Sequence, residues 1–390
     1  LASGATADRT TAGLLYVKGC TLKELRRSEE AISTFDEVVG RFANAREDAV
    51  RGLAVRSLYF KGGALGDLGR REEAIRVSDE FVARFADAPE GYIRELLADA
   101  LIMKALELVK LGRSEEAVAV SDEVIGRFVD VSLAGIREAM VKAFVIKGIG
   151  LEGLGRYAEA ISVFDQVIGR FGDAPDSRIR TQVATAIGRK AATLGKAGRR
   201  EDEVRVYGEI VSRFVHAPEV GIREQVARAL VVKGIRLGEL GQGEEAVLAC
   251  DEVLACFGDA PEAAIREQVA TALVNKAITL GKLGRAEHAA RVCDEVVDRF
   301  SDDQEAGVRK MVALIGLTRK ALESPLDRPA PPRAIASALA ERSVDHGQAQ
   351  SISPLPIHSR PPGLAPSCLR ALADRASTLR RGVLSLLKRR

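Results

Sequence analysis

A repeat of 43 residues runs through the chain and constrains its fold more than any other feature. Phenylalanine recurs at this interval without a slip, at Phe42, Phe85, Phe128, Phe171, Phe214, Phe257 and Phe300. Glycine keeps the same interval, at Gly69, Gly112, Gly155, Gly198, Gly241 and Gly284. A fixed period of this length is typical of architectures in which similar units stack on one another. We therefore expect one array of units rather than several unrelated domains.

Each unit contains two helical patterns. Residues 87–111 carry apolar side chains at helical spacing over a wide face, and Gly112 then supplies a left-handed residue that ends a helix. We place the start of this helix at Asp87, with Pro89 in its first turn. A second helical pattern follows at once and ends at Phe128. The short turn between them makes the two helices antiparallel, with lengths of roughly 22 and 16 residues.

The composition agrees with an all-α fold. Apolar residues make up 46% of the chain, while aromatic residues make up 4% and tryptophan is absent. The core must therefore be aliphatic and rich in alanine, which favours helices over strands. We predict an α-solenoid over residues 1–323, built from about seven helical hairpins and a final unpaired helix of the first type.

The turn between the two patterns resembles that of a known family. The segment Leu-Gly-Arg-x-Glu-Glu-Ala resembles the tetratricopeptide repeat, with Gly69 and its copies at the turn and Ala74 and its copies at a small packing position. The resemblance implies stacked hairpins with a concave surface that binds a protein or peptide. The period is 43 residues instead of the family's usual ~34, so the first helices are longer, and the resemblance is to a bacterial variant of the family. The family's chaperone-tail clamp has no match here.

Lysine recurs in the first helix of every unit, and this series has two interpretations. It could form a cationic stripe that meets an acidic peptide, or each lysine could pair with the recurrent aspartate of the second helix that follows, as Lys104 with Asp122. We favour the structural interpretation, because a charge at a position that the family fills with leucine needs a partner in each unit. Gly208 replaces this aspartate in the fifth unit, so we expect Lys190 to be the most available lysine.

The candidate partner-binding residues follow from these two patterns. Tyr16 and Tyr59 fall at the fifth position of the family's repeat, and the lysines fall at its seventh. The full set of candidates is Lys61, Lys104, Lys147, Lys190, Lys233, Lys276, Tyr16 and Tyr59.

Catalytic and metal-binding patterns are absent from the sequence. It contains no phosphate-binding loop, nucleophile elbow, zinc-protease motif or calcium loop. His216 and His288 are interpreted as surface substitutions, and Cys250 and Cys293 as small buried residues at one packing position. Recurrent Asp-Glu pairs diverge on a helix and cannot flank one bond. We expect no enzymatic activity, no cofactor and no metal.

The end of the chain differs from the repeats. Residues 324–366 are rich in proline, which predicts a disordered linker, and residues 367–390 could form a basic amphipathic helix that touches a membrane surface or a partner. Residues 324–390 contain eleven basic and four acidic side chains, so the rest of the chain is mildly acidic. An acidic body is a poor match for nucleic acid. No apolar run is long enough to span a membrane.

These observations predict a cytoplasmic scaffold or adaptor that binds a protein or peptide on the concave face of the array. One alternative is a regulatory fragment of a larger signalling protein, because the sequence begins with Leu1. A second alternative is RNA binding by helical repeats. Such proteins use varied polar pairs and stacking aromatic residues, whereas this chain repeats one residue set with few aromatics.

Overall fold

The computed structural model describes residues 2–88, 90–129 and 133–323, which form fifteen α-helices and no β-strand. The first helices of the repeats are α1 Ala2–Glu24, α3 Asp48–Asp67, α5 Gly91–Lys110, α7 Ala134–Gly153, α9 Ser177–Lys196, α11 Val220–Glu239, α13 Ala263–Lys282 and α15 Ala306–Glu323. The second helices are α2 Ser28–Phe42, α4 Arg71–Phe85, α6 Ser114–Phe128, α8 Tyr157–Phe171, α10 Arg200–Phe214, α12 Gly243–Phe257 and α14 Ala286–Phe300.

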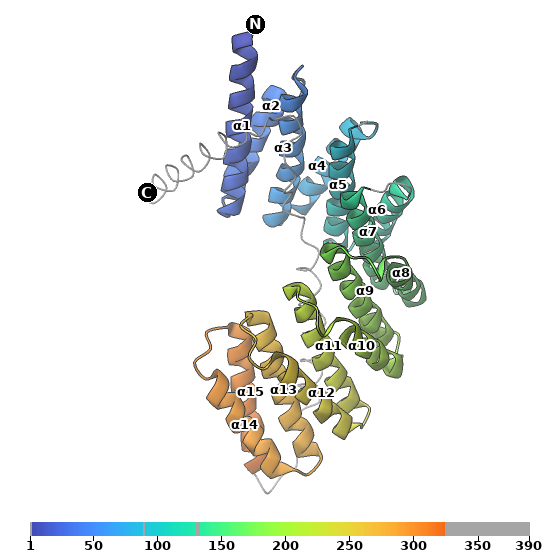
Figure 1. The fold of residues 1–390 in the computed structure, drawn as a ribbon, viewed down its shortest axis with the longest axis vertical. Coiled ribbons are helices and arrows are strands. Elements are labelled where there is room, and N and C mark those ends of the chain that lie inside the picture. Colours follow the sequence, from blue (N-terminus) through green and yellow to red (C-terminus); the bar gives the residue numbers. More distant parts are fainter. Residues whose placement is uncertain (1, 89, 130–132, 324–390) are drawn as a thin grey trace. The chain divides into compact units, whose positions relative to one another are not determined.

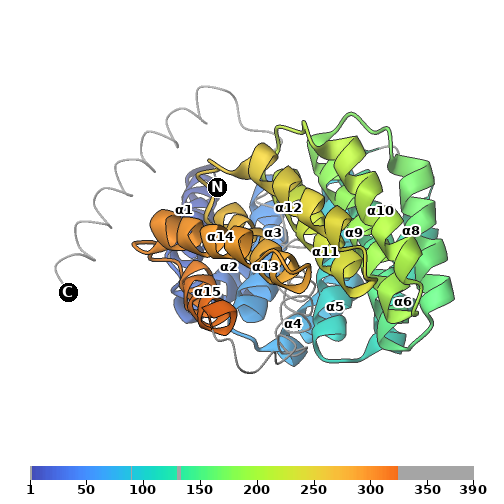
Figure 2. The same ribbon diagram turned by 90° about the horizontal axis from the view of Figure 1, so that it is seen from below.

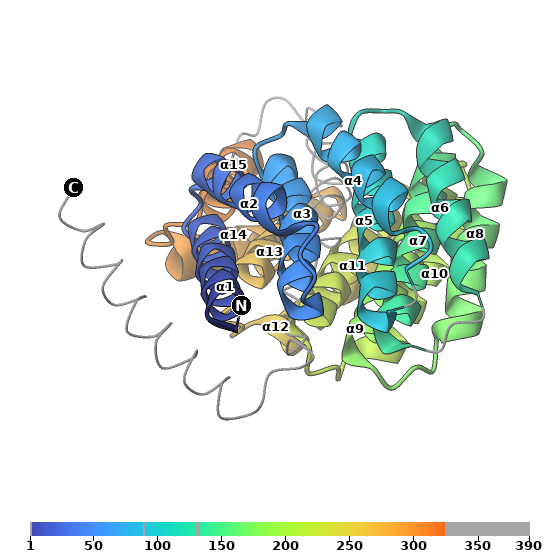
Figure 3. The same ribbon diagram turned by 90° about the horizontal axis from the view of Figure 1, so that it is seen from above.

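Seven antiparallel hairpins and the unpaired helix α15 follow one another along the chain (Figure 1). The fold is the predicted all-α solenoid. Two compact units divide inside α7, one ending at Ala139 and the other beginning at Met140. Figure 2 gives a second view of α9 to α15, and Figure 3 one of α1 to α5. The predicted tail segments 324–366 and 367–390 lie outside the described residues.

Within each compact unit, the first helix of a repeat contacts more neighbouring helices than the second helix does. Successive first helices contact one another, as α3 contacts α5 and α11 contacts α13, and each also packs against the second helices before and after it. A helix with neighbours on several sides buries most of its surface, which explains the nearly continuous apolar sequences of α5 and α13. The second helices have one apolar stripe and one charged face.

The glycine series ends the first helices as predicted. Gly69, Gly112, Gly155, Gly198, Gly241 and Gly284 all have a positive φ, between 71° and 80°. In the second repeat, the amide of Gly69 donates to the carbonyl of Gly66 and the next amide, of Arg70, donates to that of Leu65. This pattern is the Schellman arrangement, which closes a helix through a left-handed residue. In the first repeat Arg26 takes this role with a φ of 61°.

The predicted start of the first helix was wrong by about one turn. The helix α5 begins at Gly91 with Glu90 at the cap position, whereas Asp87 lies in the preceding turn. The residue before a proline is disfavoured in helical conformation. Ala88 precedes Pro89, so a helix capped by Asp87 would have to pass through the one residue that resists it.

The core uses the other recurrent residues. The phenylalanine series closes each second helix, and Phe42, Phe128 and Phe300 are buried. The alanine series is fully buried where the helices of a hairpin meet, as at Ala74. Two repeats also place a large ring against a glycine on the neighbouring helix. An added Cβ at Gly148 would come within 2.4 Å of the Phe164 ring.

Candidate functional site

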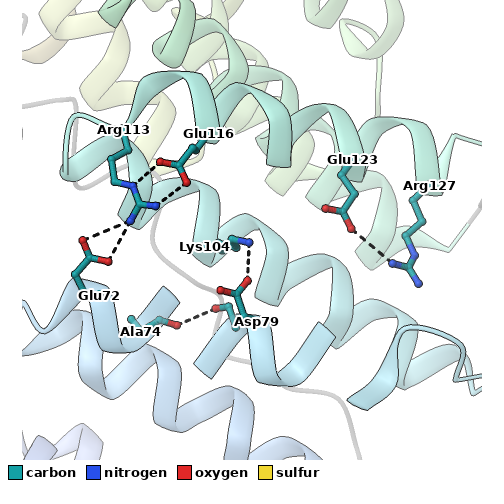
Figure 4. A network of polar contacts seen from close by, with 9 residues as sticks. Glu72, Ala74, Asp79, Lys104, Arg113, Glu116, Glu123 and Arg127 are labelled. Atoms are coloured by element: carbon teal, nitrogen blue, oxygen red, sulfur yellow. Dashed lines mark hydrogen bonds and ion pairs between the residues drawn. The ribbon is translucent and has the colours of Figure 1, made fainter. Parts of the chain in front are cut away.

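The lysine series joins neighbouring repeats. Each described pair connects a lysine on a first helix to the recurrent aspartate on the second helix immediately before it in the sequence. The N–O distances are 2.6 Å for Lys61–Asp36, 2.5 Å for Lys104–Asp79, 2.6 Å for Lys190–Asp165 and 2.5 Å for Lys276–Asp251. Arg319 makes the corresponding pair with Asp294. Figure 4 shows the pair between α4 and α5.

These pairs link neighbouring repeats, but the predicted partner aspartate was wrong. Lys104 pairs with Asp79 of the preceding repeat and not with Asp122, the aspartate on the second helix that follows it. The prediction compared only heights along two antiparallel helices. It neglected the direction in which the side chain points around the helix axis, and Lys104 lies on the side of α5 that faces α4.

The corrected pairing also changes which lysine lacks an aspartate partner. Lys190 is paired with Asp165, so it is not the least anchored member of the series. Gly208 instead has the place in sequence relative to Lys233 that Asp165 has relative to Lys190. Lys233 makes no ion pair or hydrogen bond with any described residue. Lys147, in α7, is partly buried.

A second series of contacts connects the turns of neighbouring repeats. Arg70 and Arg113, which follow turn glycines, each bind the glutamate three residues later and a glutamate on the preceding second helix. Inter-repeat distances are 3.0 Å for Arg70–Glu29, 3.1 Å for Arg113–Glu72 and 2.7 Å for Arg285–Glu244. Figure 4 shows Arg113 between Glu72 and Glu116. These side chains are exposed, so each pair contributes at most about 1 kcal/mol.

Two further series of arginines link neighbouring repeats at the ends of the helices away from the turn glycines. Arginines that precede recurrent phenylalanines reach the end of the preceding second helix, as Arg299 donates to the carbonyl of Gly258 over 2.6 Å and Arg127 donates to that of Ala86. Arginines near the start of α9, α11 and α13 reach the segment before the next first helix, as Arg180 binds Glu219 at 3.1 Å. Arg223 binds Glu262 at 2.5 Å, and Arg266 binds Asp303 at 3.0 Å. The recurrent charges of the repeat are thus used in stacking.

The two candidate tyrosines lie mainly in the core. Tyr59 is 4% exposed, and burial raises its pKa well above the ordinary value. Tyr16 is partly buried against Phe60, with ring centroids 6.0 Å apart, and burial also raises its pKa. The structure therefore does not place Tyr59 on a surface where a partner could reach it.

The side of the first helices opposite the lysine series carries residues that differ from repeat to repeat. Arg228 lies five residues before Lys233 on α11, which places it about 140° away around the helix. Its guanidinium is partly buried and makes no hydrogen bond or ion pair with any described residue. Burial lowers its pKa, while the carboxylates of Glu224 and Glu267 act in the opposite direction. On α11 this side, opposite the lysine series, carries Arg228. We call the same side of α9, α11 and α13 the first-helix face.

Sequence reasoning missed the charged side chains that are buried in single repeats. Glu203 replaces the small alanine of the other units, is 1% exposed, and binds Arg236 of α11 at 3.0 Å. Its second oxygen has no hydrogen-bond partner among the described residues. Gly195 accommodates it, because an added Cβ there would lie 2.5 Å from that carboxylate. The break in the alanine series was the only sequence signal.

The remaining candidate groups fit the sequence interpretation. His216 and His288 are exposed, while Cys250 and Cys293 are buried. Burial raises the pKa of the Cys250 thiol to about 12, which suppresses its reactivity. Within residues 2–88, 90–129 and 133–323, no cluster of His, Cys, Asp and Glu could hold a metal ion. None of the described helices is long and apolar enough to cross a membrane.

Comparison with known proteins identifies one repeat of the chain by its sequence. A family model for the tetratricopeptide repeat matches residues 12–44. No curated protein sequence matches the chain. A tetratricopeptide repeat protein from Parabacteroides merdae is similar in structure, with a TM-score of 0.43, 13% identity, and coverage of 79% of this chain and 99% of that one. An engineered protein has a TM-score of 0.43, 14% identity, and coverage of 75% and 71%.

The matched segment extends to the other repeats through the period. Residues 12–44 contain most of α1 and all of α2, and the same turn, alanine and phenylalanine positions return at the constant interval of the repeat up to Phe300. The pattern that the family model matches once is therefore built seven times in the structure. Residues 12–44 match the tetratricopeptide repeat, and the chain repeats the same pattern with a long period and lengthened first helices.

Proposed function

We propose that this chain is a cytoplasmic scaffold that binds a protein or peptide partner on the first-helix face. The proposal rests on a difference between the recurrent charged residues and Arg228. Recurrent lysines and arginines link neighbouring repeats, as Lys276 and Arg285 do, whereas Arg228 on the first-helix face has no hydrogen-bond or ion-pair partner within the described residues. A partly buried guanidinium without a hydrogen-bond acceptor gains from an acceptor that a partner supplies.

The composition of this face supports a peptide rather than a nucleic acid. Arg228 lies between Glu224 on its own helix and Glu267 on α13, so the positive charge is local and flanked by carboxylates. A nucleic acid requires many basic contacts along its phosphates. A peptide requires only a few directed hydrogen bonds and apolar contacts. The four cysteines among the described residues are free thiols, which suits the proposed reducing compartment.

The test uses peptides selected from a displayed library on the purified chain, with affinities then measured by fluorescence anisotropy. We expect Arg228→Ala to weaken the selected peptides about tenfold or more, because a hydrogen bond to a charged group contributes about 1.5–3 kcal/mol. The control is Arg205→Ala, which removes an exposed arginine from the second helix α10. Failure to enrich any peptide, or equal binding by wild type and Arg228→Ala, would contradict binding at this face.

A further inference from the structure

One junction between repeats lacks the links that its counterparts have on the side of the second helices. Lys233 of α11 faces the position of Gly208 on α10, where the paired junctions have an aspartate. Gln242 stands where the turn arginine would reach Glu201, and Cys256 stands where an arginine would reach the end of α10 at Val215. Three different stacking contacts are thus missing between the same two repeats.

The missing contacts lie along one line. The positions that would accept them are residues 201 and 208 on α10 and residue 215 directly after it, each seven residues apart. Residues at this spacing lie on the same side of an α-helix, here the side that faces the next repeat. The side of α10 that faces the next repeat therefore lacks these three recurrent links.

The two repeats are still held together at their turns. Arg236 of α11 binds Glu203 at 3.0 Å, and Arg200 of α10 binds Glu239 at 2.7 Å. The helices α10 and α11 also keep an extensive contact. The missing links along α10 are therefore a local feature of the surface and do not reflect a separation of the repeats.

The space over Gly208 and the charge of Lys233 suit an acidic side chain. A Cβ added at Gly208 would meet no atom within 4 Å, so the space directly over Gly208 is vacant, where the paired junctions carry an aspartate side chain. Lys233 beside it is partly buried and has no carboxylate partner among the described residues. The equivalent Lys276 meets its carboxylate at 2.5 Å. A partly buried ammonium gains from such a partner, because burial removes part of its hydration.

We propose that Lys233 and the vacant space over Gly208 form a docking site for an Asp or Glu side chain of a protein partner. The partner's carboxylate takes the place that Asp251 occupies beside Lys276. This inference rests on the proposed function, since it requires a partner protein. It adds a second contact point to that function, on the side of α11 away from Arg228.

The test uses the variant Gly208→Asp, in which the chain's own aspartate occupies the proposed site. A displayed peptide library is selected on the wild-type chain in the presence of excess soluble Gly208→Asp chain, which absorbs peptides that bind elsewhere. Enriched peptides are synthesised, and their affinity for each variant is measured by fluorescence anisotropy. Gly208→Ala is the matched control, because it adds a Cβ without a charge. Lys276→Met controls for the loss of a lysine that already has a partner.

We expect the enriched peptides to share an Asp or Glu, and to bind about tenfold more weakly to Gly208→Asp and to Lys233→Met. Gly208→Ala and Lys276→Met should leave the affinity unchanged. Replacing the shared acidic residue of the peptide with its amide should cost as much as Lys233→Met, with no further loss when both changes are combined. Peptides that bind Gly208→Asp as well as wild type would overturn this site and leave the first-helix face standing. If peptides are enriched only when the Gly208→Asp competitor is left out, this site is overturned and the first-helix face stands. If no peptide is enriched with or without the competitor, both proposals are overturned.

Discussion

Replacing Gly148 with alanine is expected to lower the free energy of unfolding by about 1–3 kcal/mol, because it overfills a packed core. The new Cβ would lie 2.4 Å from the Cε1 and Cζ atoms of Phe164, whose ring is fully buried. A rigid ring enclosed on all sides cannot move away as a flexible side chain could. The measurement is chemical denaturation followed by circular dichroism.

Two further variants make this prediction specific. Gly169→Ala, on the same helix as Phe164, adds a Cβ that meets nothing within 4 Å, so it should stabilise the chain by up to about 1 kcal/mol through helix propensity. Phe164→Ser removes the ring and imports the small residue found at Ser121 in the preceding repeat. Gly148→Ala should then have little or no cost in that background. An equal cost with and without the ring would show that the close contact is not its cause.

Replacing Glu203 with alanine is expected to stabilise the chain at neutral pH by about 1–2 kcal/mol, since buried ion pairs are often weaker than apolar packing. The substitution restores the residue found at Ala246 in the next repeat, where Gly238 lies opposite, as Gly195 does here. It removes a buried oxygen without a hydrogen-bond partner among the described residues. Arg236 keeps its pair with Glu239, at 2.9 Å.

The stabilisation by Glu203→Ala should depend on pH. Burial raises the pKa of Glu203 in the folded chain, and the attraction of Arg236 only partly offsets this. The folded state then holds the proton more tightly than the unfolded state, so wild-type stability falls as the pH rises above the ordinary value of 4.5. Thermal unfolding of both proteins should show their difference growing from acidic to neutral pH. A difference that shrinks over this range would contradict the raised pKa, and Glu209→Ala serves as a control on the same helix.

The sequence was sufficient to predict the architecture because each repeated residue has one local task. The turn glycines need a left-handed backbone, and the phenylalanines and alanines fill the same packing positions in each unit. Seven copies of such a pattern reinforce one interpretation. Helix lengths were also close, although the boundary near Asp87 was misplaced because the restriction on the residue before Pro89 was overlooked.

The charged contacts were harder to predict from the sequence. A lysine can pair with the aspartate of the second helix that follows it or with that of the second helix that precedes it, and only the orientation of the helices decides between them. The structure selects the preceding aspartate, which reassigns the unpaired lysine from Lys190 to Lys233. The burial of Glu203 against Gly195 depends on two substitutions that coincide in space, and no single repeat unit reveals such a pair.

A charge-swap experiment at Lys276 tests most directly whether the repeated lysines stack neighbouring repeats. Lys276→Glu should destabilise the chain by about 1 kcal/mol, because it brings two carboxylates together at a partly exposed site. Adding Asp251→Lys, on the preceding second helix, should restore most of the loss in thermal stability. Adding Asp294→Lys, on the second helix that follows, should not restore it, because that aspartate pairs with Arg319. Rescue by Asp294→Lys and not by Asp251→Lys would contradict the assignment of these lysines to the junction with the preceding repeat.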